Sequence, residues 1–303
     1  MITLLSTWTF GAALAFVALG VFVSYRLFRF PDITTDGAFT LGAVAATRLV
    51  VAGHDPLLAT LAGAAAGALA GACTGTLHAA LGIEPLLSGI LVTTALASVS
   101  LVLLGRSNVP LAGAPTLLDR GAAALLPLAR SLGFGEAADE AARLAFVLSA
   151  VAVAILLLWL FFRTRLGTAM RAGGDTPTMA RALGRRTGLL TVAGLAIANA
   201  LTALSGALVA QVQGFADVQM GIGMVVWGMA SLFLGAALVG PVRLGGALLS
   251  TAAGSVAFRL LVAGALRAGL HPDWLKATTA VVVLAALVVP GLLSRRPQGS
   301  AAR

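Results

Sequence analysis

Residues 4–28 read LLSTWTFGAALAFVALGVFVSYRLF, and this stretch determines what kind of protein the chain can be. It carries no charged residue before Arg26, and an α-helix needs about 20 apolar residues to cross a bilayer. No basic segment precedes it, it is too long for a secretory signal, and its basic residues, Arg26 and Arg29, come at its far end. We therefore interpret it as an uncleaved first membrane span whose N-terminus lies outside.

The composition of the whole chain agrees with a membrane protein. Of 303 residues, 59% are hydrophobic and 10% charged, and the mean hydropathy is +1.00, whereas a soluble domain carries about 25% charged residues. The net charge of +9 indicates basic cytoplasmic loops rather than nucleic-acid binding, for which we find no motif. The single cysteine, Cys73, excludes an internal disulfide and a Cys-based metal cluster, and its Gly and Ala neighbours predict a small packing residue.

The apolar runs predict an all-α polytopic membrane protein with about nine transmembrane helices in one domain, residues 1–303. Their boundaries are set by the polar and Gly/Pro-rich stretches between them. The expected spans are 5–28, 36–52, 57–81, 85–105, 143–162, 190–211, 221–239, 243–268 and 275–293.

Basic residues predict the orientation of these spans. Arginines cluster between residues 163 and 186 and again in the tail after residue 293, so both regions are expected to be cytoplasmic. Counting back places the N-terminus and the segment 106–142 outside. That segment contains a possible surface helix at 117–133, LLDRGAAALLPLARSLG. If this helix were a tenth span, the N-terminus would lie inside.

A ridge of small residues marks the span 57–81 as central. Gly63, Gly67, Gly71 and Gly75 recur every four residues and therefore share one face of a helix. In lipid, such ridges let helices approach closely. We expect a packing seam here, with the alternative that the seam also borders a solute pathway.

Two short segments suggest an internal repeat. Residues 30–39 read FPDITTDGAF and residues 215–224 read FADVQMGIGM, and the two are offset by 185 positions. The predicted topology places them at opposite ends of their spans, as an inverted-topology repeat requires. We therefore expect a first repeat with an outer segment in 1–142, a linking span and cytoplasmic loop in 143–189, and a second repeat in 190–303.

Acidic residues beside membrane helices either mark a pathway or cap a helix. Asp32 precedes a span, so both interpretations remain open for it. Likewise, Gly221 and Gly223 either allow close backbone approach beside a path or merely start the span 221–239. The candidate path residues are Asp32, Thr35, Asp36, Phe39, Thr93, Asn199, Gln213, Phe215, Asp217, Gln219, Gly221 and Gly223.

A short capped helix interrupts the apolar pattern in the middle of the chain. Residues 170–188 read MRAGGDTPTMARALGRRTG, in which Thr176 can cap a helix, Pro177 suits its first position and Gly184 stops it. A helix at 177–183 is too short to span a membrane and marginal alone, so it is expected to dock on a cytoplasmic partner. Its apolar residues share a face that Arg181 points away from: Met179, Ala180 and Leu183.

The passage from Arg163 to Gly184 resembles the cytoplasmic coupling loop of ATP-binding cassette (ABC) importer permeases of the branched-chain amino acid and ribose group. Within that group the chain is most similar to permeases paired with tryptophan/tyrosine-type periplasmic binding proteins. The resemblance extends from Phe30 to Gly246 through FPDITTDGAFTLGA, GRSNVPLAG from Gly105, and SGALVAQVQGFADVQMGIGMVVWGMASLFLG from Ser205. Thr176 departs from the asparagine common in relatives, but both residues cap helices.

The resemblance implies a type II importer fold in the bacterial inner membrane, with two permease copies, two ATPase subunits and a periplasmic binding protein. ATP and Mg²⁺ would belong to the ATPase, since this sequence has no G-x-x-x-x-G-K-S/T loop and its only lysine is Lys276. No spacing of residues suggests a catalytic, cofactor or metal site in this chain. The expected solute is small, roughly neutral and organic, such as an amino acid, with an aromatic one favoured by the resemblance.

Two other functions are alternatives to an importer subunit: a secondary transporter, and a channel-like or structural subunit. A secondary transporter also uses inverted repeats, but it needs ion-coupling acids near the middle of the membrane, whereas the acids here fall near the ends of spans. A channel-like or structural subunit would have no ATPase partner.

In the importer, two copies would surround a central path beside residues 215–225.

Overall fold

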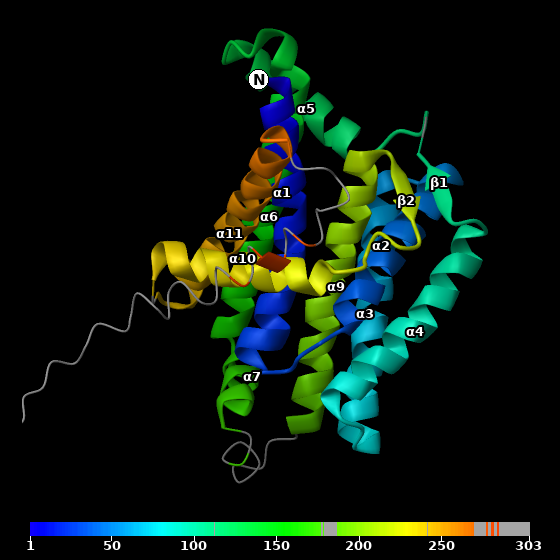
Figure 1. Cartoon of the computed structure of the whole chain (residues 1–303), viewed down its shortest axis with the longest axis vertical. Coiled ribbons are helices and arrows are strands. Elements are labelled where there is room, and N and C mark those ends of the chain that lie inside the picture. The colour runs from blue at the N-terminus through cyan, green and yellow to red at the C-terminus, as the bar shows by residue number, and fades with distance from the viewer. Residues whose placement is uncertain are drawn as a thin grey trace, which may run out of the picture.

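The computed structural model describes residues 1–111, 113–176, 178, 187–240 and 242–269, with the isolated positions 277, 280, 281 and 284. These residues form a bundle of helices (Figure 1), of which six are long and apolar enough to cross a membrane. The six are α1 (Ile2–Val21) with its continuation η1 (Phe22–Leu27), α3 (Pro56–Leu81), α4 (Pro85–Leu104), α6 (Ala138–Arg163) after the short η2 (Gly135–Ala137), α9 (Thr187–Gln213) and α11 (Leu244–Arg267).

The other described helices are shorter or less apolar: α2 (Thr34–Val51), α5 (Leu117–Ser131), α7 (Arg165–Asp175) and α10 (Met224–Val239). Helices thus cover the predicted spans as far as residue 268. Most of the last predicted span, 275–293, lies outside the described residues, so the count of nine stays a prediction.

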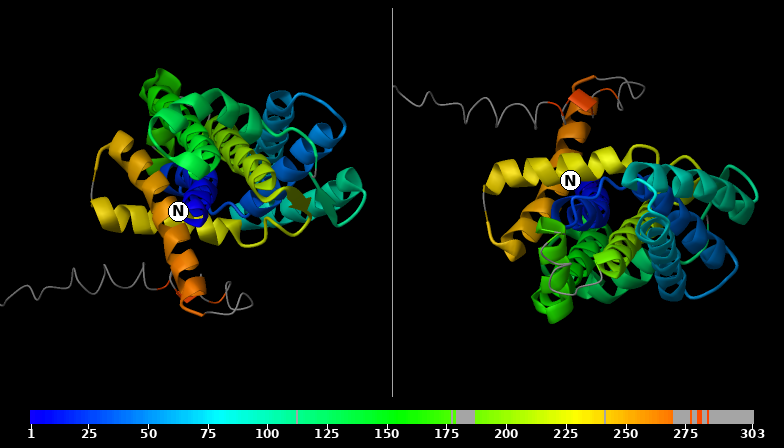
Figure 2. Two further views of the ribbon diagram at one scale, coloured as in Figure 1. Left: turned by 90° about the horizontal axis from the view of Figure 1, so that it is seen from above. Right: turned by 90° about the horizontal axis from the view of Figure 1, so that it is seen from below.

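Helix α1 is the central helix of the bundle, where α6, α9, α10 and α11 contact it (Figure 2). Every residue from Gly11 to Val21 is buried. A helix that is apolar all round needs neighbours on all sides, and the small residues in this stretch let those neighbours approach closely.

The glycine ridge of α3 packs against α9 and α2. Gly63, Gly67, Gly71 and Gly75 are all buried, and a β-carbon at Gly67 or Gly71 would meet backbone oxygen atoms of α9. The packing seam predicted on this face is therefore confirmed, whereas other faces of α3 carry exposed leucines such as Leu58 and Leu69. Cys73, which we expected to be a packing residue of the same helix, is exposed, because it lies off the ridge.

The span predicted at 221–239 is a shorter helix with a different direction. Helix α10 has 16 residues, which extend about 24 Å at 1.5 Å per residue. Figures 1 and 2 show it crossing the upright helices instead of running along them. Gly223 precedes it with a φ of 89°, a conformation that glycine adopts without strain, and so turns the chain into the helix.

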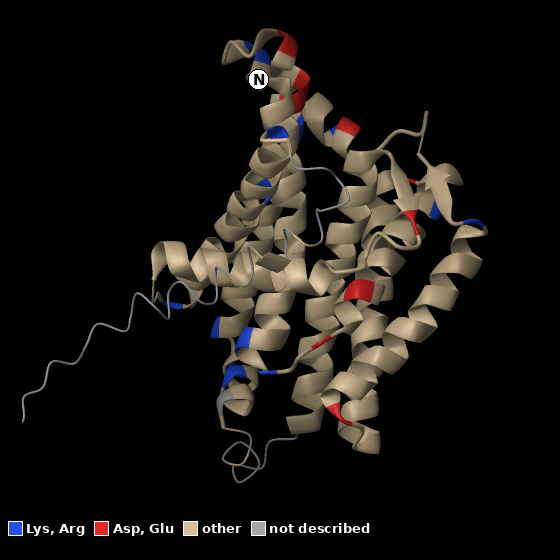
Figure 3. Cartoon of the chain, viewed as in Figure 1, with Lys and Arg blue, Asp and Glu red and all other residues tan. Residues whose placement is uncertain are grey.

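The N-terminus and α5 lie at one end of the bundle, and α7 lies at the opposite end (Figure 1). Arginines lie at both ends of the bundle, whereas most acidic side chains lie toward the α5 end (Figure 3). Helix α5 begins with a capping box between Thr116 and Asp119, so the predicted helix at 117–133 is confirmed. Its 15 residues are too few for the alternative of a tenth span.

Two short strands depart from the purely helical expectation. Strand β1 (Asn108–Pro110), after α4, pairs antiparallel with β2 (Phe215–Asp217), after α9. The register places Val109 opposite Ala216, and both side chains are buried. A pairing of so few residues between distant loops leaves no periodic pattern in the sequence.

Candidate translocation path

Side chains at the start of α2 bind backbone N–H groups at the start of α10. Asp36, in the first turn of α2, accepts hydrogen bonds from the N–H groups of Gly223 at 2.9 Å and Val225 at 2.8 Å. One turn later, the Thr40 hydroxyl accepts the N–H of Gly221 at 3.1 Å. The first N–H groups of a helix lack acceptors within the helix, and a carboxylate also complements the positive end of its dipole. Helix α2 therefore anchors the N-terminal end of α10.

Asp32 is the centre of a buried polar junction between α2, α3 and α9, in which the side-chain oxygen of Asn199 has no hydrogen-bond partner among the described residues. One carboxylate oxygen accepts the Thr34 N–H at 2.9 Å, and the other accepts the side-chain amide of Asn199 at 2.6 Å. The Thr34 hydroxyl lies 2.7 Å from the hydroxyl of Thr74 on α3. Asp32 and Asn199 are both buried, and buried polar groups are tolerated when they are hydrogen-bonded in this way. The bond to Thr34, the first residue of α2, ties Asp32 to the start of that helix, although Ile33 occupies the N-cap position. Contact with a solute stays a prediction.

Thr93 and Thr35 border the same junction. The hydroxyl of Thr93, on α4, donates a hydrogen bond to the carbonyl of Ile33 at 3.0 Å and so ties α4 to the start of α2. Thr35 is 2% exposed. In the conformation that the structure shows, both residues support the packing of this helix start.

Five of the predicted path residues surround one cavity of about 280 Å³. Aromatic and thioether side chains provide a polarizable apolar surface, and two amides and one carboxylate provide polar contacts. This mixture is typical of sites for small organic ligands. The predicted residues that line it are Phe39, Gln213, Phe215, Asp217 and Gln219, together with Phe10, Val209, Met220 and Met224.

Asp217 is the only carboxylate among the residues that line this cavity. One of its oxygens accepts the Gln219 N–H at 2.7 Å, which repeats the local turn that Asp32 makes with Thr34. Its other oxygen lies 3.5 Å from the side-chain nitrogen of Asn108, a distance at the limit of a hydrogen bond. That oxygen can therefore accept a stronger donor from a solute.

Sequence reasoning missed several residues of this region. Phe10, Met220 and Met224 line the cavity, but apolar residues in apolar segments carry no signal of their own. Thr40 could have been found, because it lies four residues after Asp36 and such pairs share one face of a helix.

The predicted coupling helix lies almost wholly outside the described residues. Thr176 is described: it is exposed, and its N–H bonds to the carbonyl of Ala172 at 3.0 Å at the end of α7. Helix α7 is packed against the end of η1, since a β-carbon at Gly174 would meet the backbone of Leu27 and Phe28. The undescribed coupling residues are Pro177, Met179, Ala180, Arg181, Leu183 and Gly184.

A bundle with six described helices that are long and apolar enough to cross a membrane, closed by small-residue seams, is the architecture of a multi-pass membrane protein. The family described as "Branched-chain amino acid transport system / permease component" matches residues 3–289, and the chain belongs to this family. Its members are transport components and not enzymes.

Two relatives are similar to the chain over most of its length. The chain is 35% identical over 289 residues to a tyrosine transport system permease protein of Clostridioides difficile (strain R20291), covering 95% of this chain and 92% of that protein. It is 33% identical over 219 residues to an uncharacterized protein of Rickettsia prowazekii (strain Madrid E), covering 72% of this chain and 71% of that one. No solved structure matches the chain.

Proposed function

We propose that this chain is the transmembrane permease subunit of an ABC importer and forms the path for a small organic solute. Its membership of the permease family over residues 3–289 carries the proposal. The lack of a phosphate-binding G-x-x-x-x-G-K-S/T loop in the sequence supports a separate ATPase chain, which would bind ATP and Mg²⁺.

An amino acid is the solute that we propose, with an aromatic side chain favoured. The cavity beside β2 combines the rings of Phe10 and Phe39 with the carboxylate of Asp217, which suits an aromatic side chain that carries a hydrogen-bond donor. The relative from Clostridioides difficile is named for tyrosine transport, and this name supports the same choice.

The proposed assembly contains two copies of this chain, two ATPase subunits and a periplasmic binding protein, in a bacterial inner membrane. The ATPase would dock on residues 177–183, at the arginine-rich α7 end of the bundle. The N-terminus and α5 would lie outside, and the C-terminus inside. Arg163 at the end of α6, with Arg165 and Arg171 on α7, supports this orientation, because basic loops stay in the cytoplasm.

We also propose that the chain contains two inverted repeats offset by 185 residues. If a two-fold axis relates the repeats, residue i is equivalent to residue i + 185. A contact between residue i of the first repeat and residue j of the second then has an equivalent contact between i + 185 and j − 185. Thr40 accepts the N–H of Gly221, and Asp36 accepts the N–H of Val225. Positions 40 and 225 are 185 apart, as are 36 and 221, so the two residue pairs in contact correspond under the proposed axis, although in both hydrogen bonds the accepting side chain belongs to α2.

The contact between α1 and α9 supports the same relation. The Ser205 hydroxyl donates a hydrogen bond to the carbonyl of Ala13 at 2.7 Å. A side chain at Gly20 would meet the carbonyl of Ala198. Positions 20 and 205 are again 185 apart, as are 13 and 198. The packing of α3 on α9 likewise has an image in the packing of α11 on α1.

Copurification tests the proposed importer. The tagged chain, expressed with its neighbouring genes, is expected to bring down an ATP-binding subunit, and cells carrying the complex are expected to accumulate labelled L-tyrosine. Replacing both Ala180 and Leu183 by Asp should abolish substrate-stimulated ATP hydrolysis while the chain stays in the membrane. The matched control is Leu183→Met, which keeps an apolar side chain of similar volume at the same position and should leave hydrolysis unchanged.

Uptake that persists without any ATP-binding subunit would instead establish the secondary transporter. Unchanged hydrolysis in the double variant would show that the ATPase docks elsewhere on the chain.

A further inference from the structure

A second cavity, of about 350 Å³, lies at the α5 end of the bundle between α1, α5, α6 and the end of α9. Its lining includes Arg143 and Glu140 from α6, Asp119 from α5, and Thr9 from α1. Gln213 lines both this cavity and the aromatic one beside β2, so the two cavities adjoin at that side chain. We call this second cavity the outer cavity.

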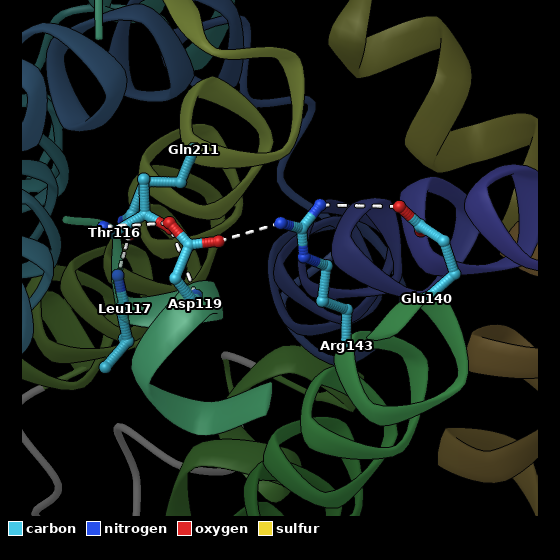
Figure 4. Close-up of polar contacts among 6 residues, drawn as sticks. All are labelled: Thr116, Leu117, Asp119, Glu140, Arg143 and Gln211. Carbon is cyan, nitrogen blue, oxygen red and sulfur yellow. Dashed lines mark hydrogen bonds and ion pairs between the residues drawn. The ribbon is translucent and has the colours of Figure 1, made fainter. Parts of the chain in front are cut away.

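Three charged side chains form the polar centre of the outer cavity. Figure 4 shows the guanidinium of Arg143 between two carboxylates: one of its nitrogens lies 2.9 Å from an oxygen of Asp119, and another lies 3.3 Å from an oxygen of Glu140. A guanidinium has five N–H donors, so three of them remain available. With two carboxylates and one guanidinium, the group carries a net negative charge.

The contacts that hold α5 in place do not explain all three charged side chains of the outer cavity. The N–H of Leu117 donates to the buried side chain of Gln211 at 2.7 Å (Figure 4), and that side chain also donates to Thr60 of α3 at 2.9 Å. Arg120 pairs with Asp55 at the start of α3, and its hydrogen bond, with those from backbone N–H groups, holds the pKa of Asp55 below the usual 3.8. The pair of Asp119 with Arg143 adds a further attachment, so α5 is held without Glu140.

Glu140 therefore needs another explanation. Its bond to Arg143 is long and joins residues three positions apart on one helix, an arrangement that contributes little stability. Its second oxygen makes no hydrogen bond with the described residues, and its side chain is 24% exposed. A carboxylate with an unused oxygen that lines a cavity, beside a guanidinium with unused N–H groups, can bind a ligand that carries both charges.

We propose that the outer cavity binds the head group of a free amino acid, with Arg143 contacting the α-carboxylate and Glu140 contacting the α-ammonium. An added ammonium and carboxylate leave the charge of the group unchanged and satisfy its free donors and acceptor. Gln213 would then border both the head group and a side chain that enters the aromatic cavity. This inference rests on the proposed amino-acid transport and adds to it a head-group site within a single permease copy.

Direct binding to the purified permease in nanodiscs tests the site. L-Tyrosine, tyramine (no carboxylate) and 3-(4-hydroxyphenyl)propionate (no ammonium) would be compared by saturation-transfer NMR. L-Tyrosine is expected to bind about tenfold or more tightly than either analogue, because each charged group contributes a charge-assisted hydrogen bond. Arg143→Gln should weaken L-tyrosine about tenfold and leave tyramine unchanged, and Glu140→Gln should weaken L-tyrosine but not the propionate.

The matched control is Arg106→Gln, an exposed arginine of the loop after α4, which should bind L-tyrosine like the unaltered chain. Since Arg143→Gln also removes the attachment to Asp119, its melting temperature is measured in parallel. Glu140→Gln, which leaves that attachment intact, decides the question if the first variant fails to fold. Equal binding of all three compounds, no binding of L-tyrosine, or unchanged binding by Glu140→Gln would overturn the head-group site.

Uptake separates this inference from the proposed function. A chain that imports L-tyrosine with its ATPase but binds it independently of Arg143 and Glu140 would retain the function and lose the head-group site. A chain that brings down no ATPase would lose the importer function, and the NMR comparison would still decide whether the outer cavity binds an amino acid.

Discussion

Asp36 lies in the first turn of α2 but satisfies the backbone of another helix. Its carboxylate accepts N–H groups at the start of α10, beside Gly223 with its positive φ. An acid that precedes an apolar run is often interpreted as a cap for that run, which is one of the two interpretations that the sequence leaves open for Asp32. At Asp36 the capped helix begins almost two hundred residues away, and only the fold brings the two together.

This role predicts a specific loss on substitution. Asp36→Ala leaves the N–H groups of Gly223 and Val225 without their acceptor in a partly buried site, and should lower the free energy of unfolding by on the order of 2 kcal/mol. Asp36→Asn, which keeps one acceptor oxygen, should lose less. Thermal unfolding of the purified protein gives the stability, and hydrogen exchange at residues 223–226 locates the change.

Asp139→Ala is the control for this prediction, because Asp139 lies exposed in the first turn of α6 and its removal should cost little. Equal losses of stability for the two alanine variants, or unchanged exchange at 223–226 in Asp36→Ala, would show that the carboxylate does not anchor α10.

For single residues, the sequence predicts which side chains have a special role, but it does not predict what those side chains contact. It identified Asp32, Asn199 and Asp217 as unusual, because polar groups are costly among apolar neighbours. The structure then separates them: Asp32 and Asn199 bond to each other in a buried junction, while Asp217 lines a cavity. Spacing along the chain cannot make that distinction, since it depends on which helices surround each residue.

At the scale of elements, the span positions and the ridge of α3 followed from local pattern. Length and hydropathy determine an apolar helix, and a four-residue spacing of glycines determines a face. The crosswise course of α10 did not follow, because a 16-residue apolar helix has the same periodicity in any orientation. Its direction is set by the contacts at its start and by its packing on α11, where a β-carbon at Gly235 would meet the carbonyl of Ser250.

Close helix packing makes a testable prediction for two glycines within helices. A β-carbon at Gly206, on α9, would meet the backbone carbonyl of Phe39 on α2, whereas one at Gly264, on α11, would meet nothing within 4 Å. Gly206→Ala should therefore force two backbones apart and destabilise the fold by about 1–3 kcal/mol or more. Gly264→Ala should be neutral or stabilising by up to about 1 kcal/mol, through its helix propensity.

Melting temperatures of the two variants in the same detergent measure this difference directly. Since both substitutions add one methyl group to a helix, the comparison removes the effect of propensity and leaves the effect of packing. If Gly206→Ala and Gly264→Ala have the same melting temperature, then α9 and α2 are further apart than the structure shows.

At the scale of the whole molecule, composition alone predicts a membrane protein, and arginine positions predict which end is cytoplasmic. What these averages cannot predict is how the loops at one end assemble. The strand pair β1–β2 and the contact of Leu117 with Gln211 join segments from distant parts of the chain. Both cavities are lined by residues from segments that are distant in the sequence, so their lining residues were only partly predictable.

The proposed inverted repeat makes a prediction about the two Phe-x-Asp segments, which should be reached from opposite faces of the membrane. Cysteines at Pro31 and Gln219 are the informative probes, because both residues are exposed, whereas Thr35 is 2% exposed and would react poorly. The background is Cys73→Ala, since Cys73 is itself exposed. An impermeant maleimide should label Gln219→Cys from the outside of intact cells and Pro31→Cys only in inverted vesicles.

Two reference cysteines calibrate this labelling. Leu132→Cys, just after α5, should follow Gln219→Cys, and Arg165→Cys, at the start of α7, should follow Pro31→Cys, because the structure places α5 and α7 at opposite ends of the bundle. Labelling of positions 31 and 219 from the same face would mean that the two segments are not related by an axis in the membrane plane. The paired hydrogen bonds between α2 and the start of α10 would then be a local coincidence, and the proposed repeat would be lost while the family assignment stood.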